Sequence, residues 1–221
     1  MKKNILTFVP LLLLSGCSNN DIFSYELIED IDAYAISFNY DFYQQNKHIE
    51  ILEIPEFYKD KKIESIGNFY LLKNLKSVGM SDSITSIGNS AFFDCTNLES
   101  VVFSRELISI SMMAFNNCVK LDNVDLPDKV TELGDGSFYN CINLNTIILP
   151  ASIEKIGYNS FLHTSLDNTY YEGTKEMWDS VLVDSGNSEL ISTIHYFSES
   201  EPTDNTASYW HFDENGSRVL W

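Results

Sequence analysis

Apolar residues recur along the middle of the chain with a period of 23 residues. The repeated unit reads Ile-Gly-x-x-Ala-Phe-x-x-Cys-x-x-Leu-x-x-Val-x-Leu and starts at Ile87, Ile110, Leu133 and Ile156. An aliphatic residue stands three positions before each start, and a weaker copy begins at Ile66, 21 residues before the next copy. Self-similarity at this period predicts stacked coils, each of which buries its apolar face against its neighbours.

Each unit has two halves with different patterns. In the second half two apolar residues flank a polar one, as at Val124 and Leu126, which predicts a short strand with one buried face. Pro127 and Pro150 end two of these strands, as expected for a residue without an N–H to donate. The first half carries a glycine that suits a tight turn with positive φ, at Gly67, Gly88, Gly134 and Gly157.

Equivalent side chains of successive units are expected to line up inside the stack. A phenylalanine recurs in each unit and predicts an aromatic spine formed by Phe92, Phe115, Phe138 and Phe161. Burying each ring contributes about 1.5–3 kcal/mol. A cysteine recurs in three units, at Cys95, Cys118 and Cys141. Equivalent positions lie about 5 Å apart with side chains in one direction, which is poor geometry for a disulfide. We therefore expect a ladder of buried free thiols. A metal site is the weaker alternative, because no histidine or further cysteine recurs beside them.

The first residues have the pattern of a targeting signal. Lys2 and Lys3 precede an apolar run, 5–14, that is too short to span a bilayer. The sequence Leu-Ser-Gly-Cys that ends at Cys17 resembles a bacterial lipobox, in which the bond before the cysteine is cut and the cysteine is lipidated. We expect a signal peptide over 1–16, a lipid anchor on Cys17 and a polar tether over 17–29. The alternative is an ordinary signal peptide with a chance cysteine.

The other boundaries follow from where the repeat begins and ends. Residues 30–62 are expected to form an N-terminal cap, with strand-like patterns at 34–38 and 49–55. The repeats occupy 63–168. Residues 169–221 are expected to form a C-terminal cap, because the last unit replaces the cysteine with Thr164. Near the end of the chain, the segment 213–216 predicts a hairpin with an Asn-Gly turn. Its spacing does not fit a calcium loop.

Composition and charge exclude several classes of partner. Hydrophobic residues make up 44% of the chain, so a sizeable core is expected, and the formal net charge is -18. This charge argues against nucleic acid, because binding phosphates requires clustered Lys and Arg. The four histidines are scattered without metal-ligand spacing, and no catalytic or nucleotide-binding fingerprint is found. We therefore expect no enzymatic activity, metal or cofactor.

The units that start at Ile87 (IGNSAFFDCTNLESVVF) and Leu133 (LGDGSFYNCINLNTIILP) resemble the BspA-like leucine-rich repeats of bacterial surface proteins. The resemblance covers about residues 50 to 170. It implies an α/β-type repeat solenoid that is curved, with a parallel sheet on the concave face and a small aromatic-rich C-terminal cap. It also implies extracellular binding or adhesion, and it supplies no catalytic residues. The departures are mild and include Ser111 in place of Gly and the pair 70–71 in place of Ala-Phe.

Two surfaces are candidates for binding. Side chains between the buried positions of the predicted sheet point outward and form polar, acidic columns in which two aliphatic residues are exposed. The candidate ligand-binding residues are Lys76, Glu99, Val102, Asp122, Asp125, Asn145 and Ile148. A merely solvated sheet face is the alternative. In the tail, Tyr209, Trp210 and Trp221 could stack on sugar rings, although we favour their forming the core of the cap.

These features predict a lipid-anchored protein of a bacterial cell envelope, exposed at the surface, that binds an extracellular protein or glycan without catalysis. One alternative is a structural coat or scaffold protein that packs against itself or against envelope partners. A more remote alternative is a carbohydrate-active enzyme that uses the aromatic tail.

Overall fold

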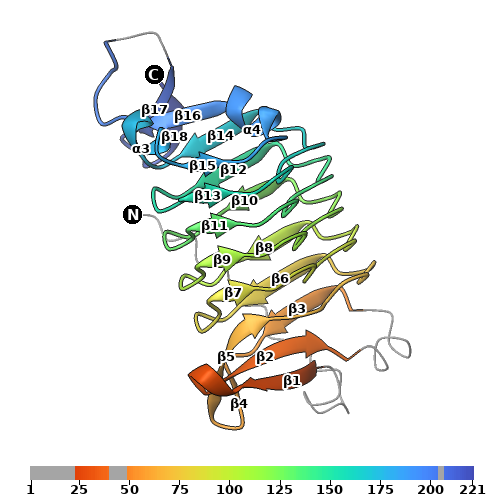
Figure 1. Ribbon diagram of the computed structural model, residues 1–221. Coiled ribbons are helices and arrows are strands. Elements are labelled where there is room, and N and C mark those ends of the chain that lie inside the picture. The colour runs from red at the N-terminus through yellow and green to blue at the C-terminus, as the bar shows by residue number, and fades with distance from the viewer. Residues whose placement is uncertain (1–22, 40–48, 204–206) are drawn as a thin grey trace.

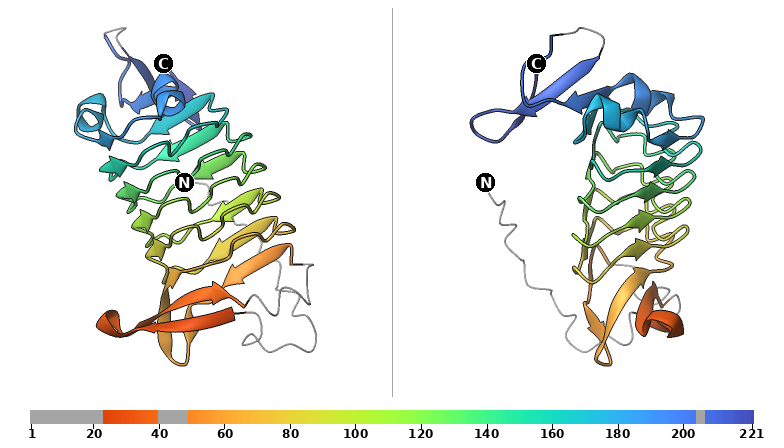
Figure 2. Two further views of the ribbon diagram at one scale, coloured as in Figure 1. Left: turned by 45° about the vertical axis from the view of Figure 1, so that its right-hand side comes forward. Right: turned by 60° about the vertical axis from the view of Figure 1, so that its left-hand side comes forward.

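The structure is a computed structural model that describes residues 23–39, 49–203 and 207–221. The repeats stack into a solenoid of about six turns built mostly from short parallel strands. Figures 1 and 2 show the coils lying one above another, with an N-terminal hairpin at one end of the stack and the tail at the other. The repeat solenoid with parallel sheets, predicted from the period and the resemblance, is therefore confirmed.

Strands line two sides of this stack. One side carries a nine-stranded sheet in which successive coils pair in parallel. Its members, in pairing order, are β1 (Phe23–Ile28), β2 (Ala33–Phe38), β5 (Lys61–Ile66), β7 (Ser86–Ile87), β9 (Ser109–Ile110), β11 (Glu132–Leu133), β13 (Lys155–Ile156) and β15 (Leu182–Val183), with β4 (Phe57–Tyr58) paired to β5. The sequence did not predict the two-residue strands of this side, because they are too short to show an alternating pattern.

The second side carries two further sheets. The first contains β3 (Ile51–Ile54), β6 (Ser77–Met80) and β8 (Ser100–Val102), and the second contains β10 (Asn123–Asp125), β12 (Thr146–Leu149), β14 (Asn168–Tyr171), β16 (Ile194–Phe197), β17 (Ser208–Phe212) and β18 (Arg218–Leu220). Strands β8, β10 and β12 are the ones that the second half of the repeated unit predicts. We call the outward surface of β3, β6, β8, β10, β12 and β14 the wide face.

The N-terminal cap begins earlier than the sequence suggests. A tether is expected over 17–29, yet Phe23–Ile28 form strand β1, which pairs antiparallel with β2. The reason is that Phe23 is buried and its ring packs against that of Phe69, 6.2 Å away, at the open end of the spine. The one-turn 3-10 helix η1 (Glu29–Ile31) joins the two strands. Residues 1–22, with the predicted signal peptide and Cys17, lie outside the described residues.

An aromatic spine runs through the core, as predicted. The rings of Phe92, Phe115, Phe138 and Phe161 are fully buried and stack at centroid distances of 5.3–5.6 Å. Phe69 extends the stack by one ring, at 5.7 Å from Phe92. Assigning residues 70–71 to the Ala-Phe position of the first unit was therefore wrong. That unit is two residues shorter after its glycine, so Phe69 occupies the phenylalanine position.

The repeated glycines have a different role from the one predicted. None of the four glycines of the repeats has positive φ. Instead, they lie where adjacent coils approach closely. A Cβ on Gly88 would lie 2.8 Å from the carbonyl oxygen of Ile66, and one on Gly134 would lie 2.5 Å from the backbone nitrogen of Met112. Real Cβ atoms avoid such distances, so the absence of a side chain, and not conformational freedom, explains these glycines.

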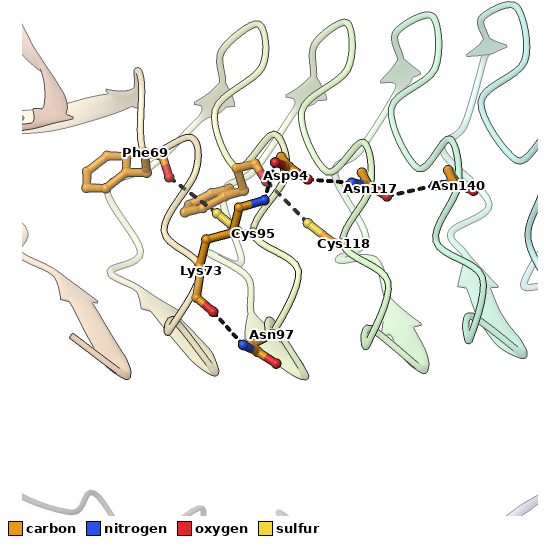
Figure 3. Close-up of polar contacts among 9 residues, drawn as sticks. Phe69, Lys73, Asp94, Cys95, Asn97, Asn117, Cys118 and Asn140 are labelled. Carbon is orange, nitrogen blue, oxygen red and sulfur yellow. Dashed lines mark hydrogen bonds and ion pairs between the residues drawn. The ribbon is translucent and has the colours of Figure 1, made fainter. Parts of the chain in front are cut away.

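Positive φ values occur elsewhere in each coil, at turns that recur every 23 residues. One column contains Leu71, Asp94, Asn117, Asn140 and His163. Asn and Asp tolerate this conformation better than most residues, and their side chains can bond to each other across coils. The Asn140 amide donates to Asn117 Oδ1 at 2.7 Å, and Asn117 in turn donates to Asp94, which also pairs with Lys73 (Figure 3). The turns are thus joined by a polar ladder on the outside of the stack.

The three cysteines form the predicted ladder of free, buried thiols. Each thiol also donates a hydrogen bond that the sequence did not predict, to the carbonyl oxygen of the phenylalanine 26 residues earlier. Figure 3 shows the bonds of Cys95 and Cys118. The sulfur–oxygen distances are 3.3 Å for Cys95 and Cys118 and 3.2 Å for Cys141. The small, weakly polar thiol therefore both fills space and satisfies a backbone acceptor.

We expect these thiols to be unreactive in the folded protein. Burial raises the pKa of Cys95 and of Cys141 to about 12, and it raises the pKa of Cys118 well above its usual range. Because the thiolate is the nucleophile, a thiol reagent at pH 8 should label none of the three in the soluble chain 18–221, and all three after denaturation. Labelling of the folded chain, or a native disulfide between any two, would contradict the ladder.

The tail closes the stack by replacing a missing coil. In inner coils the phenylalanine N–H bonds to the carbonyl of the next coil, as from Phe115 to Ser137 at 2.8 Å. After the last coil the side-chain amide of Asn187 takes this role, and its Oδ1 accepts from the Phe161 N–H at 3.1 Å. Asn187 is buried, and its Nδ2 donates to the carbonyls of Gly157 and Asp184 at 2.9 and 2.8 Å. One side chain, with three backbone partners, therefore closes the C-terminal end of the stack.

Two α-helices occur among the described residues, and both lie in the tail. Helix α3 (Lys175–Trp178) follows Thr174, whose Oγ1 accepts from the Met177 N–H at 3.4 Å as an N-cap. Helix α4 (Ser188–Ser192) follows Asn187. The predicted hairpin is also present, because β17 and β18 pair antiparallel around a turn in which Asp213 Oδ1 accepts two backbone N–H groups. No described helix has the length and the apolar character needed to cross a membrane.

Candidate binding face

The wide face is the surface on which the sequence places its candidate ligand-binding residues. Parallel pairing aligns the outward positions Glu53, Gly79 and Val102 in one sheet and Asp125 and Ile148 in the next. The 23-residue period makes Asp125 the equivalent of Val102 in the following coil, so the five positions form one column. The residues between them, such as Val124 and Ile147, are buried. The period-2 pattern therefore assigned the two faces of these strands correctly.

Most of the seven candidate residues are accessible. Lys76, Glu99, Asp122 and Asp125 are exposed, and Asn145 and Ile148 are half-buried. Val102, on the last strand of the three-stranded sheet, is 52% exposed, so an aliphatic side chain lies on the surface between acidic positions. The structure thus brings the candidates together on one surface. Whether they bind a ligand stays a prediction.

The positive charges of this region are already neutralised. Lys76 pairs with Glu50 at 2.7 Å, and Lys120 pairs with Glu99 at 3.6 Å. The same arrangement holds along the stack, where pairs about one coil apart join Arg105 to Asp82, Lys129 to Glu106, and Lys155 to Glu132. These exposed pairs contribute little stability individually. Because these cations are already paired, the excess carboxylates of the surface have no described cation as partner.

The tail hairpin meets the C-terminal end of the wide face, which sequence reasoning treated as a separate surface. Arg218 of β18 pairs with Glu172, just after β14, at 2.8 Å. Its guanidinium also lies over the rings of Trp210 and Phe212, at 5.4 and 5.6 Å. Tyr170, the next outward residue after Ile148, contacts the Trp210 ring edge-to-face at 5.9 Å. The sheet and the hairpin therefore form one corner.

The carboxyl groups at this corner have perturbed acidities. Burial raises the pKa of Asp125, the charge of Arg218 opposes this shift, and Asp128 adds to it. Asp125 is nevertheless exposed, so solvent weakens this shift. Burial also raises the pKa of Glu172, against the effect of its bond to Arg218. These shifts mark carboxylates that a further cation would stabilise.

The tail tryptophans divide between core and surface. Trp210 is 1% exposed, and its Nε1 donates to the Tyr171 carbonyl at 2.9 Å, so its ring belongs to the core of the cap. Trp178 is also buried, against Tyr171. Trp221 is 45% exposed and stacks on His211 at 3.7 Å. Trp221, but not Trp210, therefore remains accessible to a ligand.

One hydrogen-bonded trio extends the outward surface beyond β14. His195 of β16 contacts Ser208 Oγ through Nδ1 at 2.6 Å and Asn168 Oδ1 through Nε2 at 3.3 Å. Burial lowers the pKa of His195, so the neutral ring is favoured and can bridge its two neighbours. The trio links β14, β16 and β17 on their outer side. Its residues are far apart in the sequence, so no local pattern could have predicted it.

Among residues 23–39, 49–203 and 207–221, no three His, Cys, Asp or Glu side chains are grouped so that they could hold a metal ion. The chemistry that the wide face offers is therefore that of a surface: carboxylates, two aliphatic side chains and a neighbouring aromatic corner. Such a surface can bind a partner by charge and by apolar contact.

Solved structures of bacterial proteins share this fold. The leucine-rich repeat protein of T. pallidum has a TM-score of 0.63 and 25% identity, over 69% of this chain and 70% of that one. A leucine-rich cell surface protein of Faecalibacterium prausnitzii has a TM-score of 0.52 and 22% identity, over 92% and 60%. The pneumococcal vaccine antigen PcpA has a TM-score of 0.52 and 15% identity, over 77% and 50%.

The search of curated protein sequences returned no match. The family described as the BspA type leucine-rich repeat region, by contrast, matches residues 61–182 in six copies, which is more than half of the chain. This range contains the spine, the thiol ladder and most of the wide face. Proteins with this repeat and fold are typically non-enzymatic. The chain therefore belongs to the BspA-type leucine-rich repeat family of bacterial proteins.

Proposed function

We propose that this chain is a lipid-anchored bacterial surface protein that binds an extracellular macromolecule through the wide face, without a catalytic step. The observation that carries the proposal is the wide face itself, where carboxylates without a described cationic partner surround an exposed Val102 on a rigid stack. Rigid sheets are good platforms for binding because little conformational entropy is lost when a partner docks.

The family and the similar structures support an extracytoplasmic role. One protein of similar fold is described as a cell surface protein and another as a vaccine antigen. The resemblance of the residues before Cys17 to a lipobox is consistent with this location. No step of the proposal depends on bond-making chemistry.

The binding face is tested by pull-down with the soluble chain 18–221. Reversing charge at Glu99, Asp122 and Asp125 together should remove most of any captured partner, because the partner would meet repulsion where it met attraction. The thermal transition should change little, since substitutions of exposed side chains usually cost within about 0.5 kcal/mol each. Size-exclusion chromatography of the parent chain tests the scaffold alternative, which requires self-association.

A matched control reverses three exposed carboxylates away from the face, at Glu29, Asp30 and Glu154. This variant has the same net charge as the first and should retain the partner. Equal loss in both variants would mean that only bulk charge matters. If capture instead depends on Trp221 and not on the wide face, the tail is the binding surface.

The anchor is tested separately. Cys17→Ala should block lipidation, so the protein should be released from the membrane or retained as an uncleaved precursor. Membrane fractionation and metabolic labelling with a fatty acid measure this. A variant that matures and fractionates like the parent would show that the lipobox interpretation is wrong.

A further inference from the structure

The wide face has a charge distribution that favours one kind of partner. Among the described residues, the cations at this face and its edge are each paired, Lys76 with Glu50, Lys120 with Glu99, and Arg218 with Glu172. Four carboxylates have no described cation within 4 Å, namely Glu53, Asp122, Asp125 and Asp128. An anionic partner would be repelled, whereas a basic one would supply the missing charges.

Two of these carboxylates lie in line on either side of an apolar side chain. The Glu53 side chain leans over Gly79, since a Cβ on that glycine would lie 2.2 Å from Glu53 Oε2. Val102 pairs with Gly79 on the next strand, and Asp125 is the equivalent residue of the following coil, 23 residues later. The strands β8 and β10 belong to different sheets but are in contact, and equivalent positions of successive coils lie about 5 Å apart. The two carboxyl groups are therefore about 10 Å apart, with Val102 between them.

An extended peptide can match this spacing. Its side chains at positions i, i+2 and i+4 point to the same side and span about 13 Å. Flexible lysine or arginine side chains at i and i+4 can converge on carboxyl groups about 10 Å apart, and an apolar side chain at i+2 then lies over Val102. The match requires the peptide to cross the strands along the axis of the stack.

The acidities of the two carboxyl groups fit the same partner. Burial raises the pKa of Glu53, as it does for Asp125. A crowded carboxylate loses hydration, and a nearby cation restores part of the lost stabilisation. Three charged groups lie near Asp125, namely the carboxylates of Asp128 and Glu172 and the guanidinium of Arg218.

We propose that the wide face takes an extended protein segment in which two basic side chains flank an apolar one, with the apolar side chain on Val102 and the basic ones against Glu53 and Asp125. This inference rests on the proposed function and names the chemistry of its partner. Binding should weaken with salt and as the pH falls, because salt screens the charges and protonation removes them.

The probe is a labelled, end-blocked peptide Thr-Lys-Thr-Leu-Thr-Lys-Thr, measured by fluorescence anisotropy with the soluble chain 18–221. The double variant Glu53→Gln, Asp125→Asn should weaken its binding at least about tenfold, and Val102→Ser about fivefold. The control variant Glu29→Gln, Glu154→Gln removes the same charge elsewhere and should stay within about twofold of the parent. Peptides with Glu for Lys, or Ser for Leu, should bind weakly.

Three results would overturn the inference: no binding of the basic peptide, equal loss in the control variant, or equal binding of the Glu peptide. Its failure is distinguishable from failure of the proposed function. If the pulled-down partner is lost on charge reversal of the wide face but the basic peptide does not bind, the face binds a partner of another chemistry, such as a neutral glycan. If neither a partner nor the peptide binds, both are wrong.

Discussion

Phe115→Ala should lower the free energy of unfolding by about 3–5 kcal/mol, the largest effect that we expect from one substitution. The Phe115 ring is fully buried and stacks at 5.3 Å on both Phe92 and Phe138. Alanine would leave a cavity in the middle of the spine, and the coils on either side are held apart by their backbone hydrogen bonds and cannot collapse into it. Urea unfolding of the soluble chain, followed by circular dichroism, measures the loss.

The matched control is Phe57→Ala, because Phe57 is 52% exposed on the short strand β4. This change should cost less than about 1 kcal/mol. If the two alanine variants had equal effects, the stacked rings would not be the main source of cohesion. A transition that splits into two steps in the Phe115 variant would show that the coils above and below the cavity unfold separately, as repeat arrays can.

Asn187→Ala should have the second largest effect, a loss of about 2–4 kcal/mol. Removing the amide leaves the buried Phe161 N–H and the carbonyls of Gly157 and Asp184 without their bonds. Each buried group that loses its partner costs about 1–3 kcal/mol, and partial access of water reduces the sum. The loss should be concentrated at the C-terminal end of the stack.

Hydrogen exchange locates this effect. In the Asn187 variant the Phe161 amide should exchange much faster, while the Phe115 amide, which bonds to Ser137 at 2.8 Å, should remain protected. The control Asn143→Ala removes an exposed amide from the same region and should change neither rate. Unchanged protection of Phe161 in the Asn187 variant would show that the side chain is not the terminal cap.

The structure joins the sheet face and the aromatic tail into one region. The two are distant in the sequence, so the sequence presents them as separate candidate surfaces. Arg218 connects them, because it pairs with Glu172 and lies over Trp210. Its charge also opposes the rise in the pKa of Asp125. A ligand on the wide face near Asp125 therefore also lies near the hairpin, and substitutions in either can affect it.

Sequence periodicity alone determined the stack, the spine, the thiol ladder and the outward columns of the wide face. The reason is that a solenoid places residues one period apart in direct contact, so a one-dimensional pattern fixes most of the tertiary neighbours. The pattern alone places Val102 and Asp125 on the surface.

Only the tertiary structure decided where the backbones of adjacent coils lie too close for a side chain and how the two ends of the stack are closed. The sequence predicts positive φ for the glycines of the repeats. At Gly134 the reason for a glycine is instead that the backbone of the adjacent coil lies too close for a side chain. The period of a sequence gives no information about that distance. The start of the cap at Phe23, the closure by Asn187 and the corner made by Arg218 occur once each. A contact made once leaves no repeating signal, so its partners are set by three-dimensional packing of segments far apart in the chain.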